Sequence, residues 1–246
     1  MATVAGPPKG KTKDLTLAAD GRPRFIVGLS WVPKDTGPAA DYGIPPLKDA
    51  EGRYDTFYFF KFPFFLLRSC FRFLMTLLAP SLPRNASDPH DLDLFCYIVD
   101  RDMKVLHTIG PKEGSLVEPG RKVYHSGENE VGRDPTDAEQ IFVELRGLSQ
   151  EYDQFVFVAR SANRNTLADI PDATIRLADA ADNSNLLQNT IAAKALPPEK
   201  SFGYVFCSLF RKGDGWAIRN IDSFVGKEVD WQLLLQAIEL QQGLSG

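Results

Sequence analysis

The chain has few cysteines and histidines, and it lacks the short motifs that mark phosphate-binding loops and zinc sites. Its three cysteines, Cys70, Cys96 and Cys207, form no Cys-x-x-Cys pair. A disulfide framework is therefore not expected, and the thiols are predicted to be reduced and buried, as in a cytoplasmic protein. The three histidines are scattered, and neither GxxxxGK[ST] nor GxGxxG occurs. Zinc and nucleotide chemistry are therefore not indicated.

An excess of positive charge and an apolar leader are also missing. The formal net charge is −4, which argues against nucleic acid as a partner, because nucleic-acid binders carry a basic patch or stripe. Residues 1–15 lack the apolar core of a secretory signal, so export is not expected. With 43% hydrophobic and 24% charged residues, the 246-residue chain is expected to bury a packed core.

A catalytic constellation is not indicated either. Ser126, His107 and Asp102 could be combined into a triad on paper, but no Gly-x-Ser-x-Gly elbow accompanies them. The sequence therefore predicts a protein that is not an enzyme.

Short alternating segments separated by turn residues dominate the chain from residue 91 onwards, and this pattern is typical of a β-sandwich. Gly213-Asp214-Gly215 marks the clearest hairpin, and the apolar spacing over 230–242 predicts a helix. Trp31, Phe155, Phe157 and Trp216 are expected in the core. The predicted strands are 14–18, 24–32, 92–99, 104–108, 122–125, 140–146, 154–160, 173–178, 186–191, 204–211 and 216–221.

The predicted organisation is mainly β. Residues 1–12, rich in Pro, Gly and Lys, are expected to be a disordered lead. Residues 13–228 are expected to form one sandwich domain, which is interrupted at 34–88 by a polar loop and an apolar arm. Residues 229–246 complete the chain as a C-terminal helix and tail.

The turn at 127–139 carries the most direct chemistry. Gly127 and Gly132 allow sharp bends in it, and it offers five oxygen ligands: Glu128, Asn129, Asp134, Asp137 and Glu139. A calcium ion needs several such oxygens at about 2.3–2.6 Å. The alternative interpretation is a solvated hairpin tip, because acidic turns are common on protein surfaces.

A second group of carboxylates lies upstream. Asp91 and Asp93 stand at i and i+2, so on a strand they share one face. If the two segments meet across a sheet edge, these carboxylates join those of the turn.

These motifs resemble the TerD family of tellurite-resistance and stress-response proteins. The order and spacing of the motifs agree with the family over most of 14–226, apart from 34–88. The matching residues are FIVGLSWVP at 25–33, DLDLFCYIVD at 91–100, YHSGENEVG at 124–132, DAEQIFVELRGL at 137–148, YDQFVFV at 152–158, LADIPDATIRLAD at 167–179 and FGYVFCSLFRKGDGWAIRNI at 202–221.

The resemblance implies a two-sheet β-sandwich whose loops bind calcium. Carried over residue by residue, it assigns the metal to Asp91, Asp93, Glu128, Asn129, Asp137 and Glu139. The chain departs from the family pattern at Arg133 and Ala138, where acids are usual, and at Val32, where the family has Asp. Fewer carboxylates and an added cation are expected to weaken calcium binding, so a degenerate metal site is the alternative.

The apolar stretch at 57–79 is the largest departure from the family. As a helix it would place Arg68 and Arg72 on one face, and that basic amphipathic pattern is typical of helices that lie in a membrane interface. Pro63 and the internal charges argue against a full span. The predicted contact residues are Phe64, Phe65, Leu67, Arg68, Phe71, Arg72, Leu74, Met75 and Leu78.

Three covers for this apolar arm remain open: a membrane surface, a protein partner or second copy, and the sandwich itself. The sequence therefore predicts a non-enzymatic, calcium-binding stress-response protein that acts as a binding or scaffold module. Its predicted location is the cytoplasm, at the inner face of the membrane where the arm docks there. The alternative is an assembly protein that oligomerises through the arm and has a degenerate metal site.

Overall fold

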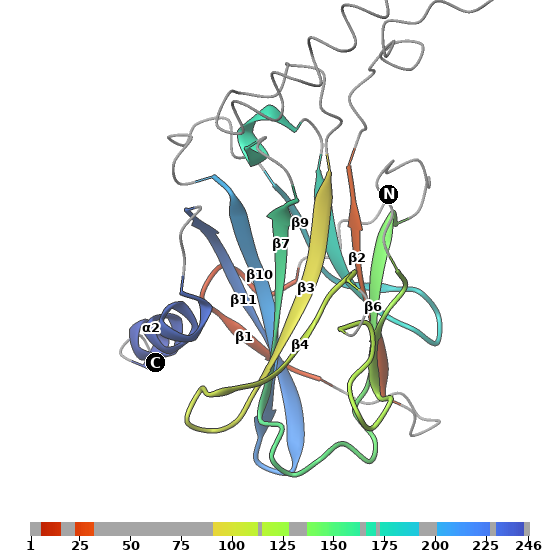
Figure 1. The fold of residues 1–246 in the computed structure, drawn as a ribbon. Coiled ribbons are helices and arrows are strands. Elements are labelled where there is room, and N and C mark those ends of the chain that lie inside the picture. The colour runs from red at the N-terminus through yellow and green to blue at the C-terminus, as the bar shows by residue number, and fades with distance from the viewer. Residues whose placement is uncertain are drawn as a thin grey trace, which may run out of the picture. The chain divides into compact units, whose positions relative to one another are not determined.

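Two antiparallel β-sheets packed face to face form most of the part of the protein described by a computed structural model (Figure 1). The structure describes residues 6–15, 23–31, 91–112, 115–127, 137–162, 166–170, 173–191, 201–226 and 230–243. Residues 1–34 and 90–246 belong to one compact unit, and both sheets lie within it. The predicted apolar arm lies outside the described residues.

The larger sheet has six strands in the order β1-β11-β10-β7-β3-β4. Its longest strands, β10 and β11, form the predicted hairpin, and Gly213 at the turn has a φ of 58°, which glycine adopts without strain. The strands are β1 (Thr12–Asp14), β3 (Leu92–Val99), β4 (Val105–Ile109), β7 (Gln154–Ser161), β10 (Gly203–Lys212) and β11 (Gly215–Val225).

The smaller sheet has five strands in the order β5-β6-β2-β8-β9. The early strand β2 lies at its centre and pairs with β6 and β8, which come much later in the chain. The strands are β2 (Arg24–Ser30), β5 (Val123–His125), β6 (Glu139–Glu144), β8 (Thr174–Asp179) and β9 (Asn185–Thr190). A short 3-10 helix, η1 (Leu167–Asp169), precedes β8.

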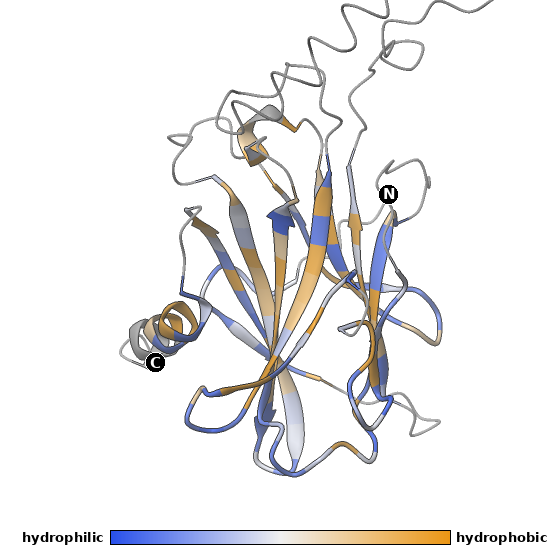
Figure 2. Cartoon of the chain, viewed as in Figure 1, coloured by the Kyte–Doolittle hydropathy of each residue, from blue (hydrophilic) through white to orange (hydrophobic). Residues whose placement is uncertain are grey.

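The main core lies between the two sheets and is built by the inward residues of each alternating strand. Figure 2 shows the resulting change between apolar and polar residues along the strands. Trp31, Phe155, Phe157 and Trp216 all belong to this core, which confirms their prediction as core residues.

The outer face of the six-stranded sheet carries a second apolar cluster, covered by the helix α2 (Trp231–Gly243). The Trp231 ring stacks on Tyr97 with centroids 5.1 Å apart. The Arg160 guanidinium lies over both Phe95 and Trp231, 5.0 and 5.2 Å from the ring centroids. Stacking and cation–π contacts therefore fix the start of the helix on the sheet.

The predicted strands from residue 92 onwards agree with the structure to within one or two residues, except that β11 continues to Val225. The predicted disordered lead is wrong for residues 6–12. Asn220 accepts a backbone hydrogen bond from Gly10 and donates its side-chain amide to the Pro7 carbonyl. These bonds bring the segment alongside β11, where β1 adds an edge strand.

Cys96 and Cys207 are buried free thiols, as predicted, and burial raises the pKa of each well above its usual value. Cys70 lies outside the described residues. Within the ranges that the structure describes, no helix is both long enough and apolar enough to cross a membrane.

Replacing Trp231 by alanine is expected to lower the free energy of unfolding by about 2–3 kcal/mol, because it removes the stack on Tyr97 and a partly buried aromatic ring. Urea denaturation measures the loss. Leu233, on the same helix but 63% exposed, is the matched control, and its alanine variant is expected to stay within about 0.5 kcal/mol of the parent protein. Equal losses in the two variants would contradict the packing described for α2.

Candidate metal centre

Glu139, the first residue of β6, points into the space between the sheets and is 0% exposed. Its Oε2 accepts a hydrogen bond of 2.7 Å from the Leu94 amide of the opposite sheet. That amide is available because β4 pairs with β3 only from Cys96 onwards. One carboxylate oxygen therefore ties the two sheets together through a charge-assisted hydrogen bond.

His125, at the end of β5, orients the same carboxylate. Its Nδ1 accepts a 2.9 Å hydrogen bond from the Gly127 amide, so that nitrogen carries no proton. The ring proton then lies on Nε2, which faces Glu139 Oε2 at 3.3 Å. A neutral histidine therefore donates to the carboxylate while it fixes the start of the acidic turn. Gly127 has a φ of 107°, a left-handed conformation that favours glycine at this bend.

The other oxygen of Glu139, Oε1, is inaccessible to solvent and has no hydrogen-bond partner within the part of the chain that the structure describes. A buried carboxylate oxygen without a donor is costly, since desolvation is not offset. Oxygen donors of this kind suit a hard cation such as calcium. Glu139 thus fits the metal that the resemblance implies.

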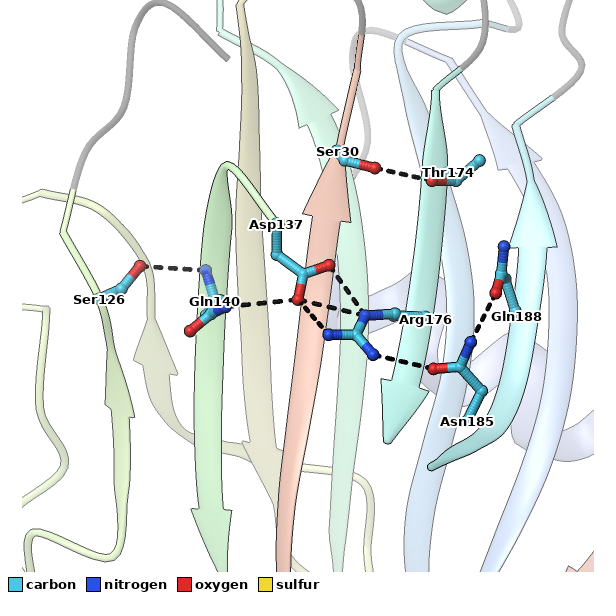
Figure 3. Close-up of polar contacts among 8 residues, drawn as sticks. All are labelled: Ser30, Ser126, Asp137, Gln140, Thr174, Arg176, Asn185 and Gln188. Carbon is cyan, nitrogen blue, oxygen red and sulfur yellow. Dashed lines mark hydrogen bonds and ion pairs between the residues drawn. The ribbon is translucent and has the colours of Figure 1, made fainter. Parts of the chain in front are cut away.

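Asp137 lies elsewhere. It precedes β6, so the strand alternation that would put it beside Glu139 does not apply to it. Its carboxylate lies across β2 on the outer face of the five-stranded sheet, where Arg176 of β8 binds it (Figure 3). The Arg176 Nη2 is 2.6 Å from Asp137 Oδ2, and this hydrogen bond is the main reason that the pKa of Arg176 is raised.

Asp93 lies on a third surface. Leu92 and Leu94 belong to the core between the sheets, so alternation directs Asp93 to the other face of β3. Its cross-strand neighbour there is Arg160 of β7, the residue that lies over the Trp231 ring. Asp93 is nevertheless mostly buried, with 8% exposure.

The structure therefore separates the three carboxylates: Glu139 lies between the sheets, Asp137 on the outer face of the five-stranded sheet and Asp93 on the outer face of the six-stranded sheet. Asp91 directly precedes β3, and both Glu128 and Asn129 lie outside the described residues. Among described residues, no group of three His, Cys, Asp or Glu side chains is arranged to hold a metal ion. Calcium binding stays a prediction, and Glu139 is the residue best placed for it.

Ser126, His107 and Asp102, the residue types of a catalytic triad, do not form one in the structure. Ser126 Oγ accepts the Gln140 amide at 3.0 Å. The His107 ring packs edge-on against Tyr152, with centroids 5.5 Å apart. All three residues are described, and no hydrogen bond joins them.

Sequence reasoning missed Arg176 and Gly28. Arg176 alternates with Ile175 and Leu177, which marks it as outward-facing, but its partner depends on strand register. Gly28 interrupts an otherwise apolar strand, and a glycine there signals a close approach by another group. A Cβ at Gly28 would lie 2.2 Å from the Asp137 Cγ.

The fold and the buried acid define the class of protein: an antiparallel two-sheet β-sandwich with a carboxylate fixed between its sheets. A family model described as the TerD domain matches residues 78–230. The match covers more than half of the chain, which therefore belongs to the TerD family.

Relatives and solved structures agree with this assignment. The tellurium resistance protein TerX of Serratia marcescens is 26% identical over an alignment of 161 residues, which covers 56% of this chain and 75% of the relative. A crystal structure of a homologue of telluride resistance protein (TerD) from Streptomyces coelicolor A3(2) has a TM-score of 0.51 and 14% identity, and the match covers 87% of this chain and 96% of that one. A crystal structure of a protein of unknown function has a TM-score of 0.53 and 13% identity, with 87% and 95% covered. At these identities the two structures show the fold alone.

Replacing Gly28 by alanine is expected to lower the free energy of unfolding by roughly 2–3 kcal/mol, because the added methyl group collides with the Asp137 carboxylate. Urea denaturation measures the loss. In an Asp137→Ala background the collision is absent, so the same substitution is expected to cost less than about 1 kcal/mol. An unchanged cost in that background would show that the Asp137 carboxylate is not what Gly28 makes room for.

Proposed function

We propose that this chain is a non-enzymatic binding module of a bacterial tellurium-resistance or stress-response system, and that calcium is its ligand at Glu139. The names of the TerX and TerD relatives support the first part. The second part rests on one observation: Glu139 is fully buried, with one oxygen fixed by Leu94 and the other without a partner among the described residues.

The burial of this site favours an ion over a larger ligand. The side chains of Glu139 and His125 are both 0% exposed, so a substrate could not reach them without local opening. A bound ion that only stabilises the fold does not need a path by which a substrate reaches the site. This is the reason for proposing a structural tie and not a catalytic centre.

Calcium would supply positive charge at the Glu139 carboxylate and would bring additional oxygen ligands to it. The chain contributes the fixed parts: the Leu94 amide and the His125 ring hold Oε2, and Oε1 is left for the ion. Glu128 and Asn129, from the turn that starts after Gly127, are proposed to complete the site, together with Asp91. The bound ion would join the turn to the sandwich and fix a surface for a partner.

The apolar insertion gives the proposal a second part, which concerns location. Residues 57–79 are rich in Phe and Leu and carry Lys61, Arg68 and Arg72. A basic amphipathic segment binds anionic membrane surfaces through buried apolar area and electrostatic attraction. We place the protein in the cytoplasm, where Cys96 and Cys207 stay reduced, and at the inner face of the membrane.

Calcium is expected to raise the melting temperature of the full chain at millimolar concentration, because a ligand that binds only the folded state stabilises it by mass action. Glu139→Gln is expected to lose most of this rise, since the amide keeps an oxygen for the Leu94 hydrogen bond but carries no charge. Differential scanning calorimetry with calcium or a chelator measures both.

The matched control for that experiment is Glu144→Gln, on the same strand but with its side chain 29% exposed. This variant is expected to keep the full response to calcium. A parent protein whose melting temperature ignores millimolar calcium, or a Glu139→Gln variant that responds as strongly as the parent, would refute the metal part of the proposal.

Deleting residues 56–80 tests the role of the apolar arm. The parent chain is expected to float with vesicles that contain anionic lipid, and the deletion variant is expected to remain in the unbound fraction. The oligomeric state of the deletion variant is expected to equal that of the parent. Vesicle flotation and light scattering after gel filtration measure these properties. If the deletion instead reduces the oligomer to a smaller species and flotation never occurred, the assembly alternative is correct.

A further inference from the structure

The Asp137 carboxylate is held by a fork of guanidinium donors. Arg176 Nε lies 2.9 Å from Oδ1 and Nη2 lies 2.6 Å from Oδ2, so both oxygens are bound (Figure 3). The Asp137 side chain is 2% exposed and that of Arg176 is 19% exposed. This bidentate geometry is the strongest that a carboxylate and an arginine form.

The rest of the Arg176 guanidinium also meets oxygen. Its Nη1 donates to the Asn185 Oδ1 at 2.9 Å, and Asn185 donates in turn to Gln188 Oε1 at 2.7 Å. Gln140 donates to Asp137 Oδ2 at 3.3 Å. Two carboxylate oxygens and an amide oxygen therefore surround one positive group, and oxygens of these types are also calcium ligands.

The backbone makes room for this arrangement. Gly28 pairs with Gln140 on one side and with Arg176 on the other, so it lies beneath the carboxylate that joins them. A Cβ at this position would be within 2.5 Å of all three carboxyl atoms of Asp137. The close approach of Asp137 to β2 thus depends on the register of three neighbouring strands, β6, β2 and β8, and on the absence of a side chain at Gly28.

We propose that Arg176 is a built-in cation that takes the place of a metal ion at Asp137. The guanidinium stays charged at every physiological pH, and a divalent ion bound to Asp137 would lie within a few ångströms of it and be repelled. Asp137 is therefore outside the calcium site, although its sequence position assigns it there. The end of the acidic turn is fixed to the five-stranded sheet without metal.

This inference refines the proposed calcium site, by removing one ligand from it, and it holds whether or not calcium binds at Glu139. Asp137 and Glu139, two residues apart, then have different structural roles. The end at Asp137 is held permanently by an arginine, and the Glu139 carboxylate, two residues on, is left for an exchangeable ion.

A double-mutant cycle in the presence of a chelator tests the pair itself. Arg176→Gln leaves a buried carboxylate without a counter-ion and is expected to lower the melting temperature by roughly 5–10 °C. Asp137→Asn is expected to lower it less, because Arg176 keeps some contact with water. The double variant is expected to be clearly more stable than the sum of the two losses predicts. Strictly additive losses would overturn the proposal.

Arg24→Gln is the matched control for that cycle. Arg24 of β2 pairs with Glu144 of β6 in the same sheet, but the Arg24 side chain is 52% exposed and the nitrogen–oxygen distance is 3.9 Å. An exposed pair contributes little, so a melting temperature within about 2 °C of the parent is expected. If Arg176→Gln fails to fold, Arg176→Lys serves instead: it keeps the charge without the fork, so it is expected to show a smaller loss and a smaller, but still non-zero, coupling to Asp137.

Adding calcium tests the claim that the guanidinium occupies a cation position. Arg176→Gln is expected to show a stabilisation by calcium larger than that of the parent, because the vacated oxygens can then bind a further ion. The Asp137→Asn/Arg176→Gln double variant is expected to show no such additional gain. Asp137→Asn alone is expected to keep whatever calcium response the parent has.

In this calcium experiment, two results would overturn the proposal: no calcium gain in Arg176→Gln, or loss of the parent's calcium response in Asp137→Asn. A parent that shows no calcium response at all refutes the Glu139 site, while the chelator cycle and the Arg176→Gln gain still decide this inference.

Discussion

A charge buried between two sheets is the constraint on which this corner of the sandwich depends. Glu139 accepts the Leu94 amide of one sheet and the His125 ring of the other. Apolar contacts hold the sheets together over most of their area, and Glu139 adds a polar contact beside the part of β3 that β4 does not pair. A short, directional hydrogen bond at that place fixes the distance between the sheets and the start of the acidic turn at the same time.

The two carboxylates at either end of Asp137-Ala138-Glu139 illustrate how differently neighbouring residues can be used. One lies on the solvent side of the sheet, neutralised by Arg176. The other lies inside, with an oxygen still available. The chain turns into β6 between them, and that change of direction separates a permanent ion pair from a position that suits an exchangeable ion.

The strands were predictable from the sequence because alternation and turn residues act locally: β3, β7 and the β10–β11 hairpin lie where the pattern places them. The site was less predictable. Asp137 and Glu139 look like i, i+2 partners on one face, but Asp137 stands before the strand and escapes its alternation. Arg176 could not be assigned to Asp137, since that pairing depends on the register of β2 between β6 and β8.

The central place of β2 also has a consequence for how the chain acquires its fold. Synthesis delivers β2 early, but both of its neighbours come more than a hundred residues later. The long segment between β2 and β3 adds little to the entropy of closing that loop, because the cost grows only with the logarithm of length. The pairing of β2 with β6 and β8 is nevertheless slow, because contacts between residues far apart in the sequence form slowly. Both edges of β2 are open until β6 has emerged, and one edge stays open until β8 follows. The nascent sandwich is therefore exposed to misassembly around its own central strand.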